Sequence, residues 1–343
     1  MPAAITRTHG GPDAQGPVLW DFSTNVNAAG PCPQAVQALA RADATRYPDP
    51  GYHALRQRLA EWHGVDARRI LLAASASEFI QRITAVGQRL AAGPVAVPAL
   101  AYGDYAVAAR ACDRTVVGAE DTTATLRWCA EPGSPLGQDA DPPHDPAATP
   151  TVLDAAYAPL RLSGVSRWSR GAEDAVFRLY SPNKALGLPG IRGAYVIAPE
   201  DAAWHVQTWC DALQAAEPSW PLGAHAVRLL ECWTEPVTQA WLADARITLR
   251  TWTDALRTTL TELDLTPTPS VTPFLCARLP AAFRPAALRH HSVAVRDTAS
   301  FGLPGWMRVS AQPPEALEAL HSALRLLATD HHPVFTSVET AQP

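Results

Sequence analysis

Short apolar segments alternate with helical segments through the first two hundred residues of this chain. The apolar segments are typical of strands, and the segments between them repeat apolar residues with a helical period. The clearest strands are expected at Arg69–Ala73, Pro94–Pro98, Leu126–Cys129 and Thr151–Asp154, with two more in residues 177–198. Strands that alternate with helices predict a mainly parallel α/β sheet, whose ligand binds at the carboxyl ends of the strands.

Beyond residue 200 the pattern changes to long helical segments rich in Trp, Ala and Leu. These are Ala202–Ala216 and Ala224–Leu263, and the part at residues 235–263 is long enough to bridge two domains. Short strands are then expected at Thr272–Leu279, Ser292–Arg296 and Met307–Ser310, before a closing helix at Pro314–Ala328. We therefore predict a three-layer α/β/α fold with a smaller α+β domain at the C-terminus. The expected divisions are an N-terminal arm and helix (1–45), a large ligand-binding domain (46–230) and a small domain (231–343).

Composition excludes several classes of protein. The net charge is −5 and no basic run occurs, which argues against nucleic-acid binding. No window approaches a membrane span and the N-terminus has no signal-peptide core, so we expect a cytoplasmic protein without membrane contact. The six cysteines lie far apart without a C-x-x-C pair, so neither a metal site nor a disulfide framework is expected.

One lysine, Lys184, lies in a turn between two apolar segments, with Ser181 three residues before it and Arg192 eight after. An amine in a partly desolvated site has a lowered pKa and can form a Schiff base with an aldehyde. Ser181 and Arg192 could bind an anion on the same molecule. Pyridoxal 5'-phosphate (PLP) carries both groups. The alternative is a solvated surface lysine, which is the commoner situation for a lysine in a loop.

Polar residues also follow other strands. The small residues Ser75–Ser77 lie between a strand and a helix, where backbone N–H groups can bind phosphate, although the same pattern also caps helices. Asp154 places a carboxylate at the end of the fourth strand. Asn25 and Asn27 lie in a turn-rich segment suited to a loop that reaches over a ligand.

Taken together, these segments resemble the fold-type-I PLP enzymes of the aminotransferase class I/II superfamily over nearly the whole chain. Ser181-x-x-Lys184 with Leu188-Pro-Gly-Ile-Arg192-Gly-Ala-Tyr is similar to the lysine motif of that superfamily. Within it, the chain resembles the group of threonine-phosphate decarboxylases and histidinol-phosphate aminotransferases. His9-Gly-Gly11, Asp21-Phe-Ser-Thr-Asn25-Val-Asn27 and Tyr47-Pro-Asp-Pro50 look more like the decarboxylases of cobalamin biosynthesis.

The resemblance implies roles around the cofactor. Lys184 would form the Schiff base and move protons, Asp154 would pair with the pyridinium nitrogen, and Tyr157 would bind the phenolic oxygen. Tyr102 would stack on the ring. The phosphate would be bound by Ser75, Ala76, Ser77, Ser181 and Arg192, and by Tyr47 from the neighbouring subunit of a homodimer.

The resemblance also implies roles around the substrate, and the chain departs from the family pattern at Ser134 and in one connection. Arg308 would bind the α-carboxylate, Arg296 would meet a substrate phosphate, and Asn25 or Asn27 would lie over the side chain. Ser134 stands where the family has an asparagine that contacts the phenolic oxygen. The connection from Gly137 to Asp154 is too short for the helix usually found there, so we expect none.

The resemblance therefore implies a PLP-dependent enzyme that acts on an amino acid. The first hypothesis is an L-threonine O-3-phosphate decarboxylase of cobalamin biosynthesis. The alternative is an aminotransferase of the histidinol-phosphate type. A third hypothesis is a non-catalytic relative that keeps the fold, motivated by Ser134 and by the missing helix.

Overall fold

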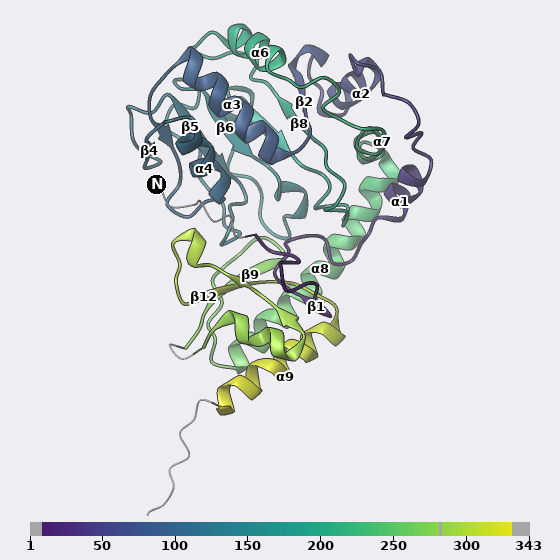
Figure 1. The fold of residues 1–343 in the computed structure, drawn as a ribbon, viewed down its shortest axis with the longest axis vertical. Helices are drawn as coiled ribbons and strands as arrows, with labels where there is room; N and C mark the ends of the chain where they lie inside the picture. Colours follow the sequence, from purple (N-terminus) through teal and green to yellow (C-terminus); the bar gives the residue numbers. More distant parts are fainter. Residues whose placement is uncertain (1–8, 281–282, 331–343) are drawn as a thin grey trace, which may run out of the picture.

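Seven strands form the central sheet of the computed structural model, which describes residues 9–280 and 283–330 (Figure 1). Their order across the sheet is β2-β8-β7-β6-β5-β3-β4. The strands are β2 (Ile70–Ala73), β3 (Val95–Ala96), β4 (Val116–Val117), β5 (Leu126–Ala130), β6 (Thr151–Asp154), β7 (Phe177–Tyr180) and β8 (Ala194–Ile197). Only β8 runs antiparallel to its neighbours, β2 and β7. The mainly parallel α/β sheet predicted from the sequence is confirmed.

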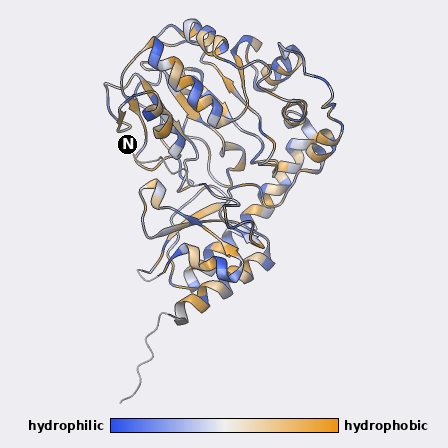
Figure 2. Ribbon diagram, viewed as in Figure 1, coloured by the Kyte–Doolittle hydropathy of each residue, from blue (hydrophilic) through white to orange (hydrophobic). Residues whose placement is uncertain are grey.

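Helices cover both faces of this sheet because its strands are rich in apolar residues along their length (Figure 2), and successive side chains point to opposite faces. Along β2, Leu71 packs with one buried cluster, whereas Ile70 and Leu72 pack with another. The first cluster contains residues of α3 (Ala76–Leu90), α4 (Gly103–Ala111) and α6 (Val206–Ala215). The second contains residues of α1 (Pro33–Ala40), α2 (His53–His63), α7 (Ala224–Trp233) and α8 (Pro236–Glu262). Two helical layers therefore enclose the sheet.

A smaller unit follows at the C-terminus (Figure 1). Its antiparallel sheet has the order β11-β12-β9, from β9 (Phe274–Arg278), β11 (Arg296–Asp297) and β12 (Trp306–Ser310), and α9 (Pro314–Asp330) packs beside it. The N-terminal segment joins this unit, because β1 (Trp20–Asp21) pairs in parallel with β10 (Val293–Ala294). Short 3-10 helices complete the chain at Ala67–Arg69, Ala158–Leu160, Pro285–His291 and Ala299–Phe301. The domain bounds given above stay a prediction.

The long helix α8 connects the two units through their cores. Its Leu242 and Leu249 are buried in the cluster under the large sheet, and its Leu256 and Leu260 are buried in the cluster of the small unit. The expected helical segment at 224–263 is in fact two helices, α7 and α8. Pro236 explains the break, because proline lacks the N–H needed inside a helix but fits its first turn.

The crossover from β5 to β6 contains no helix among the residues the structure describes, as the sequence indicated. The part of the sheet that such a helix would cover is covered instead by the segment before β7, which includes the short α5 (Arg170–Asp174). Trp168 is buried against Leu153 and Val176, and its indole Nε1 donates to the Ala140 carbonyl at 3.0 Å. Glu131 also binds this segment, since it accepts from Arg161 at 3.0 Å. The Trp168 indole and the Arg161–Glu131 ion pair thus hold this segment where a crossover helix would otherwise cover the sheet.

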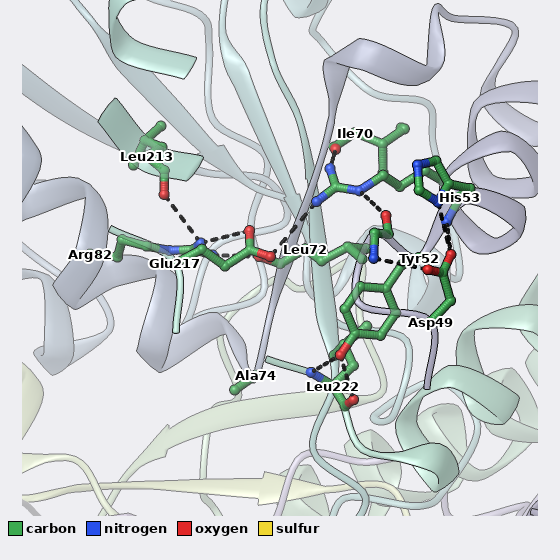
Figure 3. A network of polar contacts seen from close by, with 12 residues as sticks. Asp49, Tyr52, His53, Ile70, Leu72, Ala74, Arg82, Leu213, Glu217 and Leu222 are labelled. Carbon is green, nitrogen blue, oxygen red and sulfur yellow. Dashed lines mark hydrogen bonds and ion pairs between the residues drawn. The ribbon is translucent and has the colours of Figure 1, made fainter. Parts of the chain in front are cut away.

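A network of polar contacts ties α2 and α3 to the segment after α6 (Figure 3). Arg82 donates to Glu217 at 3.0 Å and to the backbone carbonyl of Leu72. Glu217 also lies 3.7 Å from Arg56. Tyr52 donates its hydroxyl to the Leu222 carbonyl at 2.7 Å. These contacts fix the connection that leads from α6 to α7.

No helix in the described ranges is long and apolar enough to cross a bilayer. Residues 1–8, which carried the expectation about a signal peptide, lie outside the described residues.

Candidate active site

A cavity of about 730 Å³ lies at the carboxyl ends of the parallel strands, with β11 and β12 on its other side. Most of the residues that the sequence singled out line it. They are Asn25, Ala76, Ser77, Tyr102, Ser134, Asp154, Tyr157, Ser181, Lys184, Arg192, Arg296 and Arg308. They come from many separate parts of the chain and meet here because the ends of neighbouring parallel strands lie at one edge of the sheet.

Three singled-out residues do not line the cavity. Ser75 instead caps α3, accepting at its hydroxyl from the Glu78 N–H at 3.1 Å, which is the capping alternative considered above. Asn27 is buried in backbone contacts, donating to the Ala185 carbonyl at 2.9 Å and accepting from the Ala29 N–H at 3.0 Å. Tyr47 is 78% exposed and stacks on Trp220, with the ring centres 4.4 Å apart.

One end of the cavity suits a phosphate. Ala76 and Ser77 form the first turn of α3, where backbone N–H groups lack partners within the helix and the helix dipole is positive. Ser181 donates to Asn183 at 2.8 Å, and Asn183 donates to the carbonyls of Pro189 and Ile191 at 3.2 and 3.1 Å. Asn183 therefore fixes the loop between Lys184 and Arg192. Its role could not be predicted from the sequence pattern, although Asn183 lies directly beside the lysine.

Lys184 lines the same cavity. Its Nζ is 5.6 Å from the centre of the Tyr157 ring. Tyr157 in turn packs edge-on against Phe274 of the small sheet, with ring centres 5.0 Å apart. The amine is therefore held between the two units of the fold, beside a phenol and within a cavity that both units line.

Asp154 ends β6 with its carboxylate buried. Its Oδ1 accepts from the Ala156 N–H at 2.9 Å, and its Oδ2 accepts from the Tyr105 hydroxyl at 2.6 Å. Nearby, the Tyr102 hydroxyl lies 3.2 Å from that of Ser77. Burial raises the pKa of the Tyr102 hydroxyl above its ordinary value of 10, so this phenol stays neutral. Tyr105 is a second residue that the sequence analysis left without a role.

The opposite end of the cavity is cationic. Arg296 and Arg308 are register partners on β11 and β12, and their guanidinium carbons lie 4.9 and 5.5 Å from the centre of the Phe301 ring. Arg308 donates to the Ser134 hydroxyl at 3.1 Å and to the Ser23 carbonyl at 3.2 Å. Burial lowers the pKa of Arg308, and burial together with the charge of Arg308 lowers that of Arg296 to about 10.

Arg308 is almost completely buried at this cationic end. Among the described residues, no carboxylate lies within ion-pair distance of Arg308, and its Nε has no hydrogen-bond partner. Both polar atoms of the Asn25 amide are likewise buried, with no hydrogen-bond partner among the residues that the structure describes. Buried charges and amides are costly when they are left unpaired. The site is therefore built to receive an anionic ligand.

The residues present fit PLP. Orphaned polar atoms remain for a ligand at Asn25 and Arg308, and the phosphate cradle, the lysine amine and the buried carboxylate of Asp154 surround one cavity. These are the groups needed by a molecule with a phosphate, an aldehyde and a basic ring nitrogen.

A family model described as "Aminotransferase class I and II" matches residues 17–126 and 128–324. The histidinol-phosphate aminotransferase of Granulibacter bethesdensis is 29% identical over 341 residues, covering 89% of this chain and 88% of that protein. Histidinol-phosphate aminotransferase 1 of Thiobacillus denitrificans is 29% identical over 351 residues, covering 91% and 87%.

Two solved structures share the fold. The L-threonine-O-3-phosphate decarboxylase from Porphyromonas gingivalis has a TM-score of 0.75 at 22% identity, covering 90% of this chain and 99% of that one. The histidinol-phosphate aminotransferase from Sinorhizobium meliloti, in complex with pyridoxal-5'-phosphate, has a TM-score of 0.74 at 18% identity, covering 91% and 93%.

Proposed function

The chain belongs to the aminotransferase class I and II family, and we propose that this PLP-dependent enzyme decarboxylates L-threonine O-3-phosphate for cobalamin biosynthesis. The observation that carries the proposal is the pair of buried arginines, Arg296 and Arg308, at one end of the cavity. A substrate with both a carboxylate and a phosphate brings enough negative charge to offset two neighbouring guanidinium groups.

The N-terminal segment supports the same substrate. His9 lines the cavity beside Tyr102, with ring centres 6.0 Å apart. Gly11 donates its N–H to the Ser23 hydroxyl at 2.7 Å, and a Cβ on Gly10 would lie 2.1 Å from the Ser23 carbonyl oxygen. The glycines therefore let His9 lie close to the segment that carries Asn25. The His9 ring and the Asn25 amide are therefore polar groups of the cavity wall that a bound substrate would meet.

In this proposal each residue has a defined task. PLP, when bound, supplies an aldehyde and a ring that accepts electrons. Lys184 provides the amine and moves protons, and Asp154 holds a proton on the ring nitrogen. Ser181, Arg192 and the first turn of α3 bind the cofactor phosphate. Tyr102 would pack against the ring, and Tyr157 and Ser134 would bind its phenolic oxygen.

At the substrate end, Arg308 binds the α-carboxylate, Arg296 binds the substrate phosphate and Asn25 lies over the side chain. Asn27 holds the backbone of this segment in place. By holding the α-carboxylate, Arg308 would orient the substrate and so decide which of its bonds breaks. Ser134 contributes by accepting a hydrogen bond from Arg308.

The second candidate is a histidinol-phosphate aminotransferase, favoured by the full-length similarity to proteins of that name. Incubation with threonine phosphate, followed by measurement of CO2, distinguishes it from the first. Glutamate formation from 2-oxoglutarate is measured in parallel with histidinol phosphate as amino donor. CO2 without glutamate supports the decarboxylase, whereas glutamate without CO2 rejects it in favour of the aminotransferase.

The role of the arginine pair has its own test. Arg296→Met should raise the KM for threonine phosphate at least tenfold, because one of two charge-assisted contacts is lost. Arg278→Met is the matched control, since Arg278 is an exposed arginine of the same small sheet and does not line the cavity. Equal KM values in the two variants would reject a role for Arg296 in substrate binding.

The assembly and location belong to the same proposal. We propose a homodimer in which Tyr47 reaches the phosphate site of the neighbouring subunit. The exposed Tyr47 and Trp220 support it, because paired aromatic rings at a surface often mark an interface. A cytoplasmic location is supported by the six cysteines, all of which are free thiols. Sedimentation of the purified protein as a monomer would reject the dimer.

A non-catalytic relative is the remaining possibility, and colour tests it. A protein that binds PLP through Lys184 absorbs near the violet edge of the visible spectrum, and borohydride fixes the cofactor on that lysine. A colourless protein that takes up no PLP would support the non-catalytic hypothesis against both enzymes.

A further inference from the structure

We propose that Tyr105 is a positioning residue that fixes the carboxylate of Asp154 in the rotation needed to meet the cofactor's ring nitrogen. This inference rests on the proposed function, in which Asp154 is the partner of that nitrogen. Tyr105 acts through Asp154. Its hydroxyl is the donor on one carboxylate oxygen and the Ala156 N–H is the donor on the other, at 2.6 and 2.9 Å.

The Tyr105 ring is held rigidly. It is 1% exposed and stacks on the Trp128 ring of β5, with centres 4.3 Å apart and planes inclined by 7°. The Tyr102 ring meets it edge-on at 5.8 Å and 83°. Trp128 itself is completely buried. A phenol packed between two aromatic rings cannot swing away, so its hydroxyl stays at one place relative to β6.

A rigid neutral donor suits this position. A buried carboxylate needs hydrogen bonds to remain charged, and a cationic donor would compete with the ring nitrogen for it. Burial raises the pKa of the Tyr105 hydroxyl well above its ordinary value of 10, so the proton stays on the phenol across the working pH range. Each carboxylate oxygen of Asp154 accepts one of these two hydrogen bonds and keeps a second lone pair for the cofactor.

The direct test is Tyr105→Phe, which removes one oxygen and keeps the stacked ring. We expect the dissociation constant for PLP to rise about tenfold or more, which is the usual effect of losing a hydrogen bond to a charged group. The pH dependence of the violet absorption band should shift as well, because the charge opposite the ring nitrogen is less well held. Both are measured by titrating the apoprotein with PLP and recording spectra.

The matched control is Tyr195→Phe. Tyr195 is also fully buried, stacks on an aromatic ring and has a hydrogen-bonded hydroxyl, but it does not line the cavity. A merely structural role for Tyr105 predicts that both variants lose stability and that neither changes PLP affinity or the band. Our inference predicts that only Tyr105→Phe changes them.

A double-mutant cycle with Asp154→Asn completes the test. In the Asp154→Asn background, Tyr105→Phe should change PLP affinity by less than twofold, since the acceptor charge is gone. Strong loss with Asp154→Asn but none with Tyr105→Phe overturns this inference alone. Unchanged affinity and spectrum with Asp154→Asn overturn the proposed role of Asp154, and this inference with it.

Discussion

Acid should destabilise this protein through one histidine, His63, in the last turn of α2. Its Nε2 lies 2.8 Å from the Tyr195 hydroxyl, and that hydroxyl accepts from the Trp233 indole at 3.2 Å. The hydroxyl proton is therefore directed at His63, which must accept it as a neutral ring. Burial and, secondarily, the charge of Arg178 lower the pKa of His63 from 6.5 to about 4.

The sign and size of the effect follow from proton linkage. Between pH 6.5 and pH 4 the unfolded chain binds a proton at His63 that the folded chain excludes, so the free energy of unfolding falls as the pH falls. Above pH 6.5 the unfolded chain no longer gains from binding this proton, so the free energy of unfolding keeps its full value. The loss reaches about 2 kcal/mol at pH 5 and about 3 kcal/mol below pH 4, and the partial exposure of the ring makes these upper values.

The assay is urea unfolding of the wild type and of His63→Gln at pH 8 and pH 5. Glutamine keeps a neutral acceptor for Tyr195 and does not titrate. The free energy of unfolding of His63→Gln should therefore fall by about 2 kcal/mol less than that of the wild type between pH 8 and pH 5. His205→Gln is the control, because His205 is exposed and should keep the wild-type difference. Equal differences in wild type and His63→Gln would refute the neutral buried histidine.

Four further predictions concern the site and its cover. Lys184→Ala should abolish turnover and the violet absorption without changing the midpoint of urea unfolding. Gly10→Ala should raise the KM for substrate with the fold intact, because the new Cβ collides with the Ser23 carbonyl; circular dichroism checks the fold. Ser134→Ala should raise KM about fivefold by removing one of the two acceptors of Arg308 described above, as steady-state kinetics would show. Trp168→Ala should cost about 3 to 5 kcal/mol in urea unfolding and expose residues 138–150 to limited proteolysis, whereas an unchanged cleavage rate would contradict its role as a cover.

The sequence predicted the site best where residues follow strands. Asp154 ends β6 and Ser181 comes directly after β7, and the ends of neighbouring parallel strands meet whatever path the loops take. Asn25 and Asn27 looked alike in the sequence. Only the course of the backbone shows that the Asn27 amide bonds to Ala185 and Ala29, whereas the Asn25 amide is buried in the cavity wall with no hydrogen-bond partner among the described residues.

Other features depend on contacts between distant residues, which a local pattern does not encode. Trp168 covers the part of the sheet beside the β5–β6 crossover, which contains no helix among the described residues, so the position of Trp168 could not be derived from periodicity. Tyr105 follows Tyr102 by three residues at the start of α4, but its acceptor lies on β6. The two-residue strand β4 is too short to show alternation.

The way α8 is shared has a consequence for how such chains evolve. A C-terminal part cut out at residue 231 would carry Leu242 and Leu249 as an exposed apolar stripe, and the remainder would lose the same side chains from its own interior. The small unit is therefore not a portable module that recombination could exchange on its own. Variation in substrate must instead arise by point changes on β11, β12 and the N-terminal segment, while the inherited pairing of the two halves stays the same.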